Sequence, residues 1–474
     1  MTENAGLTAH PWFFCGIGGS GMLPLATILK GRGARVSGSD RSYDQGRTPE
    51  KFAWLRDQGF ELFPQDGSGV TSPLQTLVAS AAIEDSVPEV VRARELHCPR
   101  MSRAELLAAL FNAAAAGIAV GGTSGKSTVT GMLGWIMHRT GRDPTIMNGA
   151  VMKNFVSDEV PFASARVGQG DVFVSEVDES DGSIALYRPS VAVLLNVSLD
   201  HKGMEELRAL FGDFIAAAPM AAVNLDDPES AALAGKTREM IGFGIENADA
   251  RISIEGWSDN PGGLVATVID RQDGSSHALE LAMPGRHNLA NGLAAIAGAA
   301  AAGVPVGEAV RALASFQGLA RRFDILGTSP AGVMVIDDFG HNPEKCRATL
   351  RTLKAHPGRV VAFFQPHGYG PLRQMGHALA QTFVEELGPE DVTILCDPVY
   401  FGGTVDRSEG SERIVRLIEQ ADGPNGPRAE YIPSREKCGD RIVELAQPGD
   451  RVVIMGARGD TLTTFAKDVL SRLS

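Results

Sequence analysis

The stretch GIAVGGTSGKST, residues 117–128, decides how the middle of this chain folds: an apolar run leads into a glycine-rich loop and then into a helix-forming segment. A strand, a glycine-rich turn and a helix N-terminus in this order bind phosphate, because the N–H groups of the turn and the positive end of the helix dipole face the anion. Lys126 supplies a mobile positive charge, and the Ser127 hydroxyl is a ligand for Mg²⁺.

One position departs from the usual spacing of such a loop, since Val120 stands where the first glycine is expected. An ordinary glycine-rich turn beside a surface lysine is the alternative interpretation. The apolar strand before the loop and the helix-forming residues 128–141 after it favour the phosphate site.

A second glycine-rich loop lies near the start of the chain, in FFCGIGGSGM, residues 13–22. Gly16, Gly18 and Gly21 have the spacing of a dinucleotide site. Residues 12–19, 22–33 and 34–40 read as strand, helix and strand, an alternation that indicates a parallel sheet with crossover helices. Further along, residues 102–116 are predicted to form a helix that begins with a capping box of Ser102 and Glu105.

Composition places the protein among multidomain globular enzymes. The chain has 474 residues, 43% of them hydrophobic, and single cores stop growing at roughly 250–300 residues. A net charge of −13 disfavours non-specific nucleic-acid binding. We expect a cytoplasmic protein without a membrane span, because no signal-peptide pattern is found and the five cysteines form neither a zinc motif nor a disulfide framework.

Three α/β domains are expected, over residues 1–115, 116–322 and 323–474. The middle domain carries predicted strands at 171–178 and 191–197, and a β-rich extension over 250–283 interrupts its helices. The last domain alternates five strands (333–340, 359–366, 392–398, 429–433 and 451–456) with amphipathic stretches such as 344–356 and 437–446. This alternation predicts a doubly wound sheet.

Carboxylates follow the predicted strands of the middle domain. The segment SEVDESDGS contains Glu176, Asp178, Glu179 and Asp181, and LLNVSLDHKG contains Asn196, Asp200 and His201. Ligands of an open α/β sheet bind at the carboxyl ends of its strands, and hard oxygen ligands with an imidazole suit Mg²⁺. Taken singly, an acidic loop is more often merely solvated and a lone histidine more often structural.

Further polar clusters stand at element ends. His287, Asn288 and Asn291 lie at a helix start, where amides could read a purine or cap the helix. Arg321 and Arg322 stand at the junction of the second and third domains, where an arginine can reach a phosphate or pair with a carboxylate. Three more such residues follow strands of the last domain: Asp338, His341 and His367.

The motifs as an ordered set resemble those of the Mur ligases. They are GIGGSGM, VSGSD, GTSGKST, EVDESD, NVSLDH, GRHNLANGL, FQGLARRF, DDFGHNP and FQPHGY, and together they cover nearly the whole chain. The resemblance implies an N-terminal Rossmann-like domain, a central ATPase-like domain and a C-terminal Rossmann-like domain. It further implies that the first loop holds a UDP-sugar rather than NAD, and that the C-terminal domain closes over the cleft.

The implied reaction is ATP-dependent amide formation in peptidoglycan synthesis. ATP phosphorylates the carboxylate of UDP-N-acetylmuramate, and an amino acid, L-alanine in the most similar branch, displaces phosphate from the acyl phosphate. The implied catalytic residues are Lys126, Glu176, His201 and Arg322, and the implied magnesium ligands are Ser127, Glu176 and His201.

The resemblance also implies the remaining binding residues. ATP would contact Gly122, Thr123, Ser124, Gly125, Lys126, Ser127, Thr128, Asn288, Asn291, Arg322 and Asp338. The UDP-sugar would contact Gly18, Gly19, Ser20, Gly21, Met22, Ser39 and Asp40. The carboxylate and the amine would contact Glu179, Ser180, His341, His367 and Arg373.

Some positions depart from the alanine-adding pattern. Ser124 and Ser127 replace a histidine and a threonine of the usual phosphate loop, and Asn342 stands where a second histidine is typical. In FQPHGYGPLR, side chains that the family usually carries around Tyr369 are absent, which leaves Arg373. The alternatives are therefore the same chemistry with another amine or a peptide, as in a recycling ligase, an NAD-dependent dehydrogenase that uses the first loop, and a non-catalytic nucleotide-binding protein.

Overall fold

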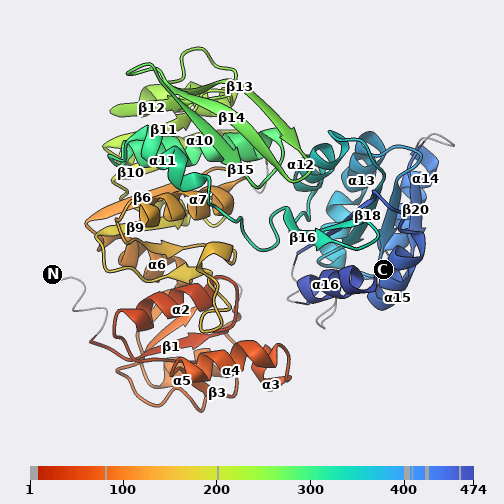
Figure 1. Ribbon diagram of the computed structural model, residues 1–474. Coiled ribbons are helices and arrows are strands. Elements are labelled where there is room, and N and C mark those ends of the chain that lie inside the picture. The colour runs from red at the N-terminus through yellow and green to blue at the C-terminus, as the bar shows by residue number, and fades with distance from the viewer. Residues whose placement is uncertain are drawn as a thin grey trace. The chain divides into compact units, whose positions relative to one another are not determined.

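The structure is a computed structural model that describes residues 9–80, 83–199, 202–399, 406–407, 409–421, 426–457 and 461–473. It divides into two compact units. The first takes in Met1–Trp257, Val265–Leu281 and Leu289–Gly318, and the second Ser258–Leu264, Ala282–Asn288 and Leu319–Ser474. Each unit is a set of parallel strands with helices on both faces, as the sequence predicts (Figure 1).

The first unit begins with a five-stranded parallel sheet in the order β3-β2-β1-β4-β5. Its strands are β1 (Trp12–Cys15), β2 (Val36–Ser39), β3 (Glu61–Phe63), β4 (Thr76–Ala79) and β5 (Arg100–Ser102). The helices α2 (Met22–Gly31), α4 (Pro49–Asp57) and α6 (Arg103–Asn112) cover one face, and α5 (Pro88–Glu95) covers the other. All four β1 residues are buried because both faces are covered.

The predicted start of α6 is confirmed. The Ser102 side chain accepts from the Glu105 N–H and the Glu105 side chain accepts from the Ser102 N–H, which completes the capping box. The predicted strand over 12–19 ends earlier, at Cys15, because the glycines after it form the loop that leads into α2.

A ten-stranded sheet forms the rest of the first unit, in the order β15-β14-β13-β12-β11-β10-β6-β9-β7-β8. Its centre is β6 (Ala116–Gly121), between β10 (Val191–Leu194) and β9 (Val172–Glu176), with β7 (Thr145–Met147), β8 (Ala165–Arg166), β11 (Met220–Asn224) and β12 (Glu239–Phe243) outside them. The β-rich extension continues this sheet as β13 (Ile252–Asn260), β14 (Gly263–Asp270) and β15 (Ser275–Leu281).

Helices cover both faces of the central strands. Side chains alternate along β10, so that Ala192 and Leu194 share a core with α8 (Met204–Ala217), whereas Val193 lies against α10 (Arg286–Ala301). Helix α7 (Lys126–Arg139) follows β6 and packs beside α11 (Val306–Leu313), where the Trp135 indole N–H donates to the Ala312 carbonyl at 3.1 Å. The phosphate loop therefore joins the central strand to a helix held on one face.

The second unit contains a six-stranded sheet in the order β16-β17-β21-β18-β19-β20. The predicted strands are β17 (Met334–Asp338), β18 (Val360–Gln365), β19 (Val392–Leu395), β20 (Arg428–Tyr431) and β21 (Arg451–Gly456). Helices α12 (Pro343–Lys354), α13 (Tyr369–Glu386) and α14 (Ser411–Ala421) cover one face, and α15 (Arg435–Leu445) and α16 (Leu462–Arg472) cover the other. The doubly wound architecture is thus confirmed.

Two features of this unit are additions to the prediction. An edge strand, β16 (Asp324–Thr328), pairs antiparallel to β17. Helix α13 begins inside FQPHGYGPLR, where Pro371 is its third residue, and a proline is tolerated there because N–H groups of a first helical turn have no partner within the helix. No helix among the described residues is long and apolar enough to cross a membrane.

Candidate active site

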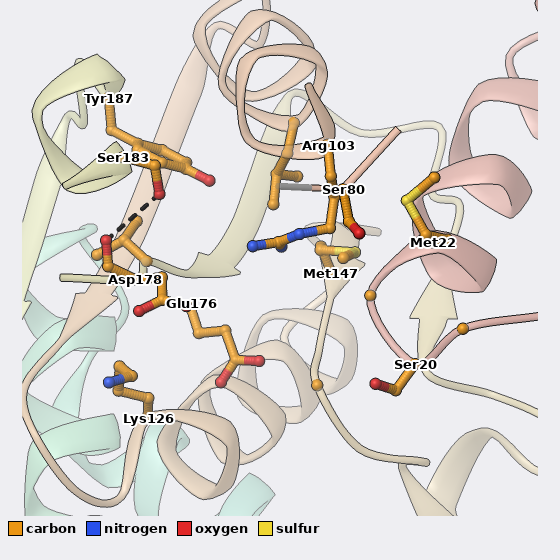
Figure 2. A pocket seen from close by; sticks show the side chains of 15 residues that line it. Ser20, Met22, Ser80, Arg103, Lys126, Met147, Glu176, Asp178, Ser183 and Tyr187 are labelled. Atoms are coloured by element: carbon orange, nitrogen blue, oxygen red, sulfur yellow. Dashed lines mark hydrogen bonds between the residues drawn. The ribbon is translucent and has the colours of Figure 1, made fainter. Parts of the chain in front are cut away.

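A cavity of about 440 Å³ lies in the first unit, between the first loop and the phosphate loop (Figure 2). Its lining combines the carboxyl edges of both sheets. It consists of Gly19, Ser20, Gly21, Met22, Ser80, Arg103, Leu107, Lys126, Met147, Gly149, Glu176, Val177, Asp178, Ser183 and Tyr187. Two glycine-rich loops far apart in the chain thus face one space.

The phosphate loop needs glycine at two positions. Gly122 and Gly125 have φ of +143° and +91°, a region that side chains disfavour. A Cβ on Gly125 would also lie 2.7 Å from Oδ1 of Asn291, which places this amide beside the loop. Val120 lies inside β6, so the departure from the usual spacing falls in the strand and leaves the turn itself unchanged.

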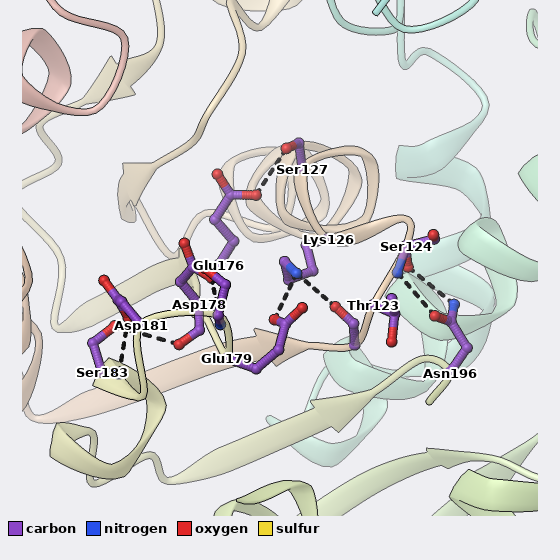
Figure 3. A network of polar contacts seen from close by, with 12 residues as sticks. Thr123, Ser124, Lys126, Ser127, Glu176, Asp178, Glu179, Asp181, Ser183 and Asn196 are labelled. Carbon is purple, nitrogen blue, oxygen red and sulfur yellow. Dashed lines mark hydrogen bonds and ion pairs between the residues drawn. The ribbon is translucent and has the colours of Figure 1, made fainter. Parts of the chain in front are cut away.

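Polar contacts from the end of β10 hold the loop in place (Figure 3). The Asn196 amide accepts from the Ser124 N–H at 2.9 Å and donates to the Ser124 carbonyl at 3.0 Å. Thr123 Oγ1 donates to the Ser198 carbonyl and accepts from the Ser198 N–H. Asn196 therefore acts on the loop backbone and fixes the direction of its N–H groups.

Lys126 lies at the start of α7 and points at the end of β9. Its Nζ donates to the Gly122 carbonyl and to Oε2 of Glu179, both at 2.7 Å. The side chains of this ion pair are 19% and 6% exposed. A phosphate that binds Lys126 must therefore compete with Glu179, a residue predicted to contact the substrate.

Two of the predicted magnesium ligands are brought together. Ser127 Oγ donates to Oε2 of Glu176 at 2.8 Å, and a Cβ on Gly149 would lie only 2.3 Å from Oε1 of the same carboxylate. The backbone thus leaves room for Glu176 only because residue 149 is glycine. A hydroxyl and one carboxylate suit Mg²⁺, which binds through one or two protein oxygens and keeps several waters.

The third predicted ligand, His201, lies outside the described residues, as does Asp200. Within the parts of the chain that the structure describes, no group of three or more His, Cys, Asp or Glu side chains is arranged to hold a metal. The assignment of magnesium to Ser127, Glu176 and His201 therefore stays a prediction.

An acidic loop, residues 178–183, follows β9 and faces the cavity. Asp178 accepts from both the N–H and the hydroxyl of Ser180, at 2.9 and 2.7 Å. Burial disfavours the charged form of Asp178, but these hydrogen bonds, with the charges of Lys126 and Arg103, bring its pKa below the ordinary value. Ser180, predicted to contact the substrate, instead shapes this loop.

The first loop is built around Asp40. Its Oδ2 accepts from the Gly18 N–H at 2.9 Å, and its Oδ1 accepts from the Ser42 N–H at 2.8 Å. The carbonyl of the buried Ser39 accepts from the N–H groups of Gly16 and Ile17. Asp40, Ser39 and Gly18 therefore give the loop its shape, whereas Gly19, Ser20, Gly21 and Met22 line the cavity.

In the second unit, Asp338 serves the fold. Its carboxylate accepts from the N–H groups of Phe323 and Gly340 and from the Thr349 hydroxyl. The Arg322 guanidinium stacks over the Phe339 ring at 4.2 Å. Asn288 is buried and donates to the Pro284 carbonyl at 2.7 Å. Their roles at ATP stay predictions, as does that of Thr128, which is buried in α7.

His341 and His367 lie side by side, with ring centroids 5.2 Å apart. Burial and the neighbouring charges of Lys345, His367 and Arg322 lower the pKa of His341 to about 3, although its ring nitrogen contacts the Phe339 carbonyl. Arg373 donates to the Asp406 carbonyl at 3.0 Å. The structure thus groups the two histidines and ties the arginine to a neighbouring segment.

Two cavity residues escaped the sequence analysis. Arg103 follows the N-cap of α6, and Tyr187 follows a short 3₁₀ turn, Ser183–Leu186. Neither belongs to a local motif, and only the packing of two sheets brings them together.

Comparison with known proteins gives consistent findings. The Mur ligase family catalytic domain matches residues 13–115, the Mur ligase middle domain 120–299, and the Mur ligase glutamate ligase domain 321–458. The chain is 37% identical to a UDP-N-acetylmuramate–L-alanine ligase of Agrobacterium fabrum, over 97% of this chain and 96% of that protein. It is 36% identical to the enzyme of that name from Brucella anthropi, over 98% and 97%.

Solved structures support the fold. The UDP-N-acetylmuramate–alanine ligase of Thermotoga maritima superposes with a TM-score of 0.78 at 24% identity, over 98% of this chain and 99% of that one. A murein peptide ligase of Psychrobacter arcticus superposes with a TM-score of 0.71 at 22% identity, over 98% of both chains.

Proposed function

This chain belongs to the Mur ligase family, and we propose that it uses ATP to join L-alanine to the carboxylate of UDP-N-acetylmuramate. The observation that carries the proposal is the cavity, which has Lys126 and Glu176 at one end and Ser20 and Gly21 at the other. A nucleotide sugar that starts at the first loop would present its carboxylate to the phosphate loop.

The reaction has two steps. A carboxylate oxygen takes the γ-phosphoryl group of ATP, which gives an acyl phosphate and ADP. The amine then attacks the acyl carbon, the new C–N bond forms, the C–O bond to phosphate breaks, and the amine loses a proton. Such chemistry depends mainly on alignment and on neutralising the charge of the moving phosphoryl group.

Residues of the first unit fit these needs. Lys126 would balance the charge on the transferring phosphate once Glu179 releases it. Ser127 and Glu176, with His201, would hold Mg²⁺, which supplies further charge neutralisation when bound. Asn291, beside Gly125, would lie next to the nucleotide. We also place the protein in the cytoplasm, since all five cysteines are free thiols, as expected in a reducing compartment.

The test is ADP release from ATP with UDP-N-acetylmuramate and a panel of acceptors: L-alanine, glycine, L-serine and a muramyl-type tripeptide. We expect L-alanine to give the highest kcat/KM. A higher kcat/KM with the tripeptide would establish the second candidate, a peptide ligase, which the altered start of α13 and the bound state of Arg373 favour testing. No ADP release with any acceptor would refute both.

A further inference from the structure

Arg103 begins α6 and lies against the start of α2. A Cβ added to Gly21 would be 3.0 Å from Cδ of Arg103, 3.5 Å from Nε and 3.6 Å from Nη1. Gly21 is the N-cap of α2 and has no side chain to satisfy the first N–H groups of the helix. A guanidinium and a ten-residue helix's positive end therefore meet at one point of the cavity wall.

Tyr187 provides an independent sign of a ligand at this place. The residue is 3% exposed, and its ring packs edge-on against Phe111 with centroids 5.2 Å apart. Its hydroxyl points into the cavity toward Arg103 (Figure 2). Among the described residues, no group hydrogen-bonds to this hydroxyl. A buried hydroxyl without a protein partner is poised for a ligand.

The hydroxyl remains a donor across the physiological range. Burial is the first cause, and the carboxylates of Asp181, Glu176 and Asp178 add to it, so the pKa of Tyr187 stands well above its ordinary value despite the opposing charge of Arg103. An acceptor on the ligand is therefore the group that suits it.

Arg103 already has an anionic neighbour that a ligand can replace. Its Nη2 lies 3.7 Å from Oδ2 of Asp181, longer than a direct hydrogen bond, and the two side chains are 26% and 34% exposed. Such a partly exposed pair contributes little. A diphosphate, which offers several oxygens to the planar guanidinium, would take the place of Asp181.

We propose that Arg103 binds the diphosphate of the sugar nucleotide in exchange for Asp181, and that Tyr187 donates a hydrogen bond to its sugar. This inference rests on the proposed function. The division of labour follows position: Arg103 lies against the first loop, whereas Tyr187 lies beside Asp178 and Ser183 on the side of Lys126, where the sugar's carboxylate must arrive.

Calorimetric titration with uridine, UDP and UDP-N-acetylmuramate tests each assignment separately. With Arg103→Ala, we expect the Kd for UDP and for the sugar nucleotide to rise at least about tenfold, and that for uridine to stay within about twofold. With Tyr187→Phe, UDP should bind as in the wild type, and UDP-N-acetylmuramate about 3- to 10-fold more weakly. Asp181→Asn should bind UDP as tightly as the wild type or more tightly.

Arg100→Ala is the matched control, because it removes the same charge from an exposed arginine at the end of β5. Unfolding of each variant without ligand checks that its fold is intact. Equal UDP affinity in Arg103→Ala and the wild type would overturn the role of Arg103. Equal sugar-nucleotide affinity in Tyr187→Phe and the wild type would overturn that of Tyr187. Wild-type protein that binds neither UDP nor UDP-N-acetylmuramate would instead refute the proposed function itself.

Discussion

At the scale of single residues, the chemistry depends most on one ammonium group. Lys126 lies in the first turn of α7, with its Nζ fixed by Gly122 and Glu179. We predict that Lys126→Ala lowers kcat for ATP-dependent phosphate release by about 10²–10³-fold or more, because a donor aimed at the transferring charge is removed. Lys437→Ala, on the exposed side of α15, is the control and should leave phosphate release unchanged. Turnover close to the wild type in Lys126→Ala would remove the phosphate loop from the mechanism.

A second residue-scale prediction concerns His341 and pH. Its pKa is about 3 in the folded protein and about 6.5 when unfolded. Between these values the unfolded chain binds the extra proton, so stability is full above pH 6.5 and falls as pH decreases toward 3. Each such group adds at most about 1.4 kcal/mol per pH unit to this loss.

We therefore expect His341→Asn to lose less unfolding free energy between pH 7 and pH 5 than the wild type, as measured by urea denaturation. His377→Asn, on the exposed face of α13, is the control and should follow the wild type. An unchanged difference between the two pH values in His341→Asn would show that the histidine does not titrate as the buried geometry requires.

At the scale of elements, the acidic loop over residues 178–183 links the two ends of the cavity. It supplies Glu179 to Lys126 and Asp181 to Arg103. ATP must displace Glu179 from Lys126, and both removal of this competitor and loss of one negative charge favour ATP. We predict that Glu179→Gln lowers the Kd for ATP by about 3- to 10-fold, or roughly 1 kcal/mol, in a calorimetric titration. Weaker ATP binding in this variant would mean that Glu179 supports the nucleotide site instead of competing for it.

Elements with strong local signals were predictable from the sequence. The capping box placed the start of α6, and the glycines with Lys126 placed the phosphate loop. Helix α13 was not predictable, because Gly368, Gly370 and Pro371 at its start are more common in loops. Strand β16 was missed because its pairing with β17 is tertiary and its five residues include a glycine.

The same distinction holds for the site. Ser127 and Glu176 stand at element ends that parallel topology brings to one edge, so their meeting could be predicted. Arg103 and Tyr187 come from two different sheets of the first unit and share no sequence pattern. Their meeting depends on how those sheets pack, which no local spacing encodes.

At the scale of the whole molecule, the chain joins two glycine-rich loops that bind different nucleotides. The domain boundaries after residues 115 and 322 stay predictions, as does closure of the C-terminal domain. We predict that a UDP-sugar at 100 times its Kd stabilises the protein by about 2.7 kcal/mol, and that NAD at the same concentration does not. A thermal shift assay measures both. Stabilisation by NAD alone would restore the dehydrogenase interpretation of the first loop.

The central claim is that the carboxylate of the sugar nucleotide is phosphorylated by ATP bound at Lys126. It is tested most directly with UDP-N-acetylmuramate labelled with ¹⁸O in both carboxylate oxygens, together with ATP and L-alanine. Mass spectrometry of the released phosphate should show one ¹⁸O atom per phosphate, because the C–O bond breaks when the amine attacks. Phosphate released without the label would contradict the account.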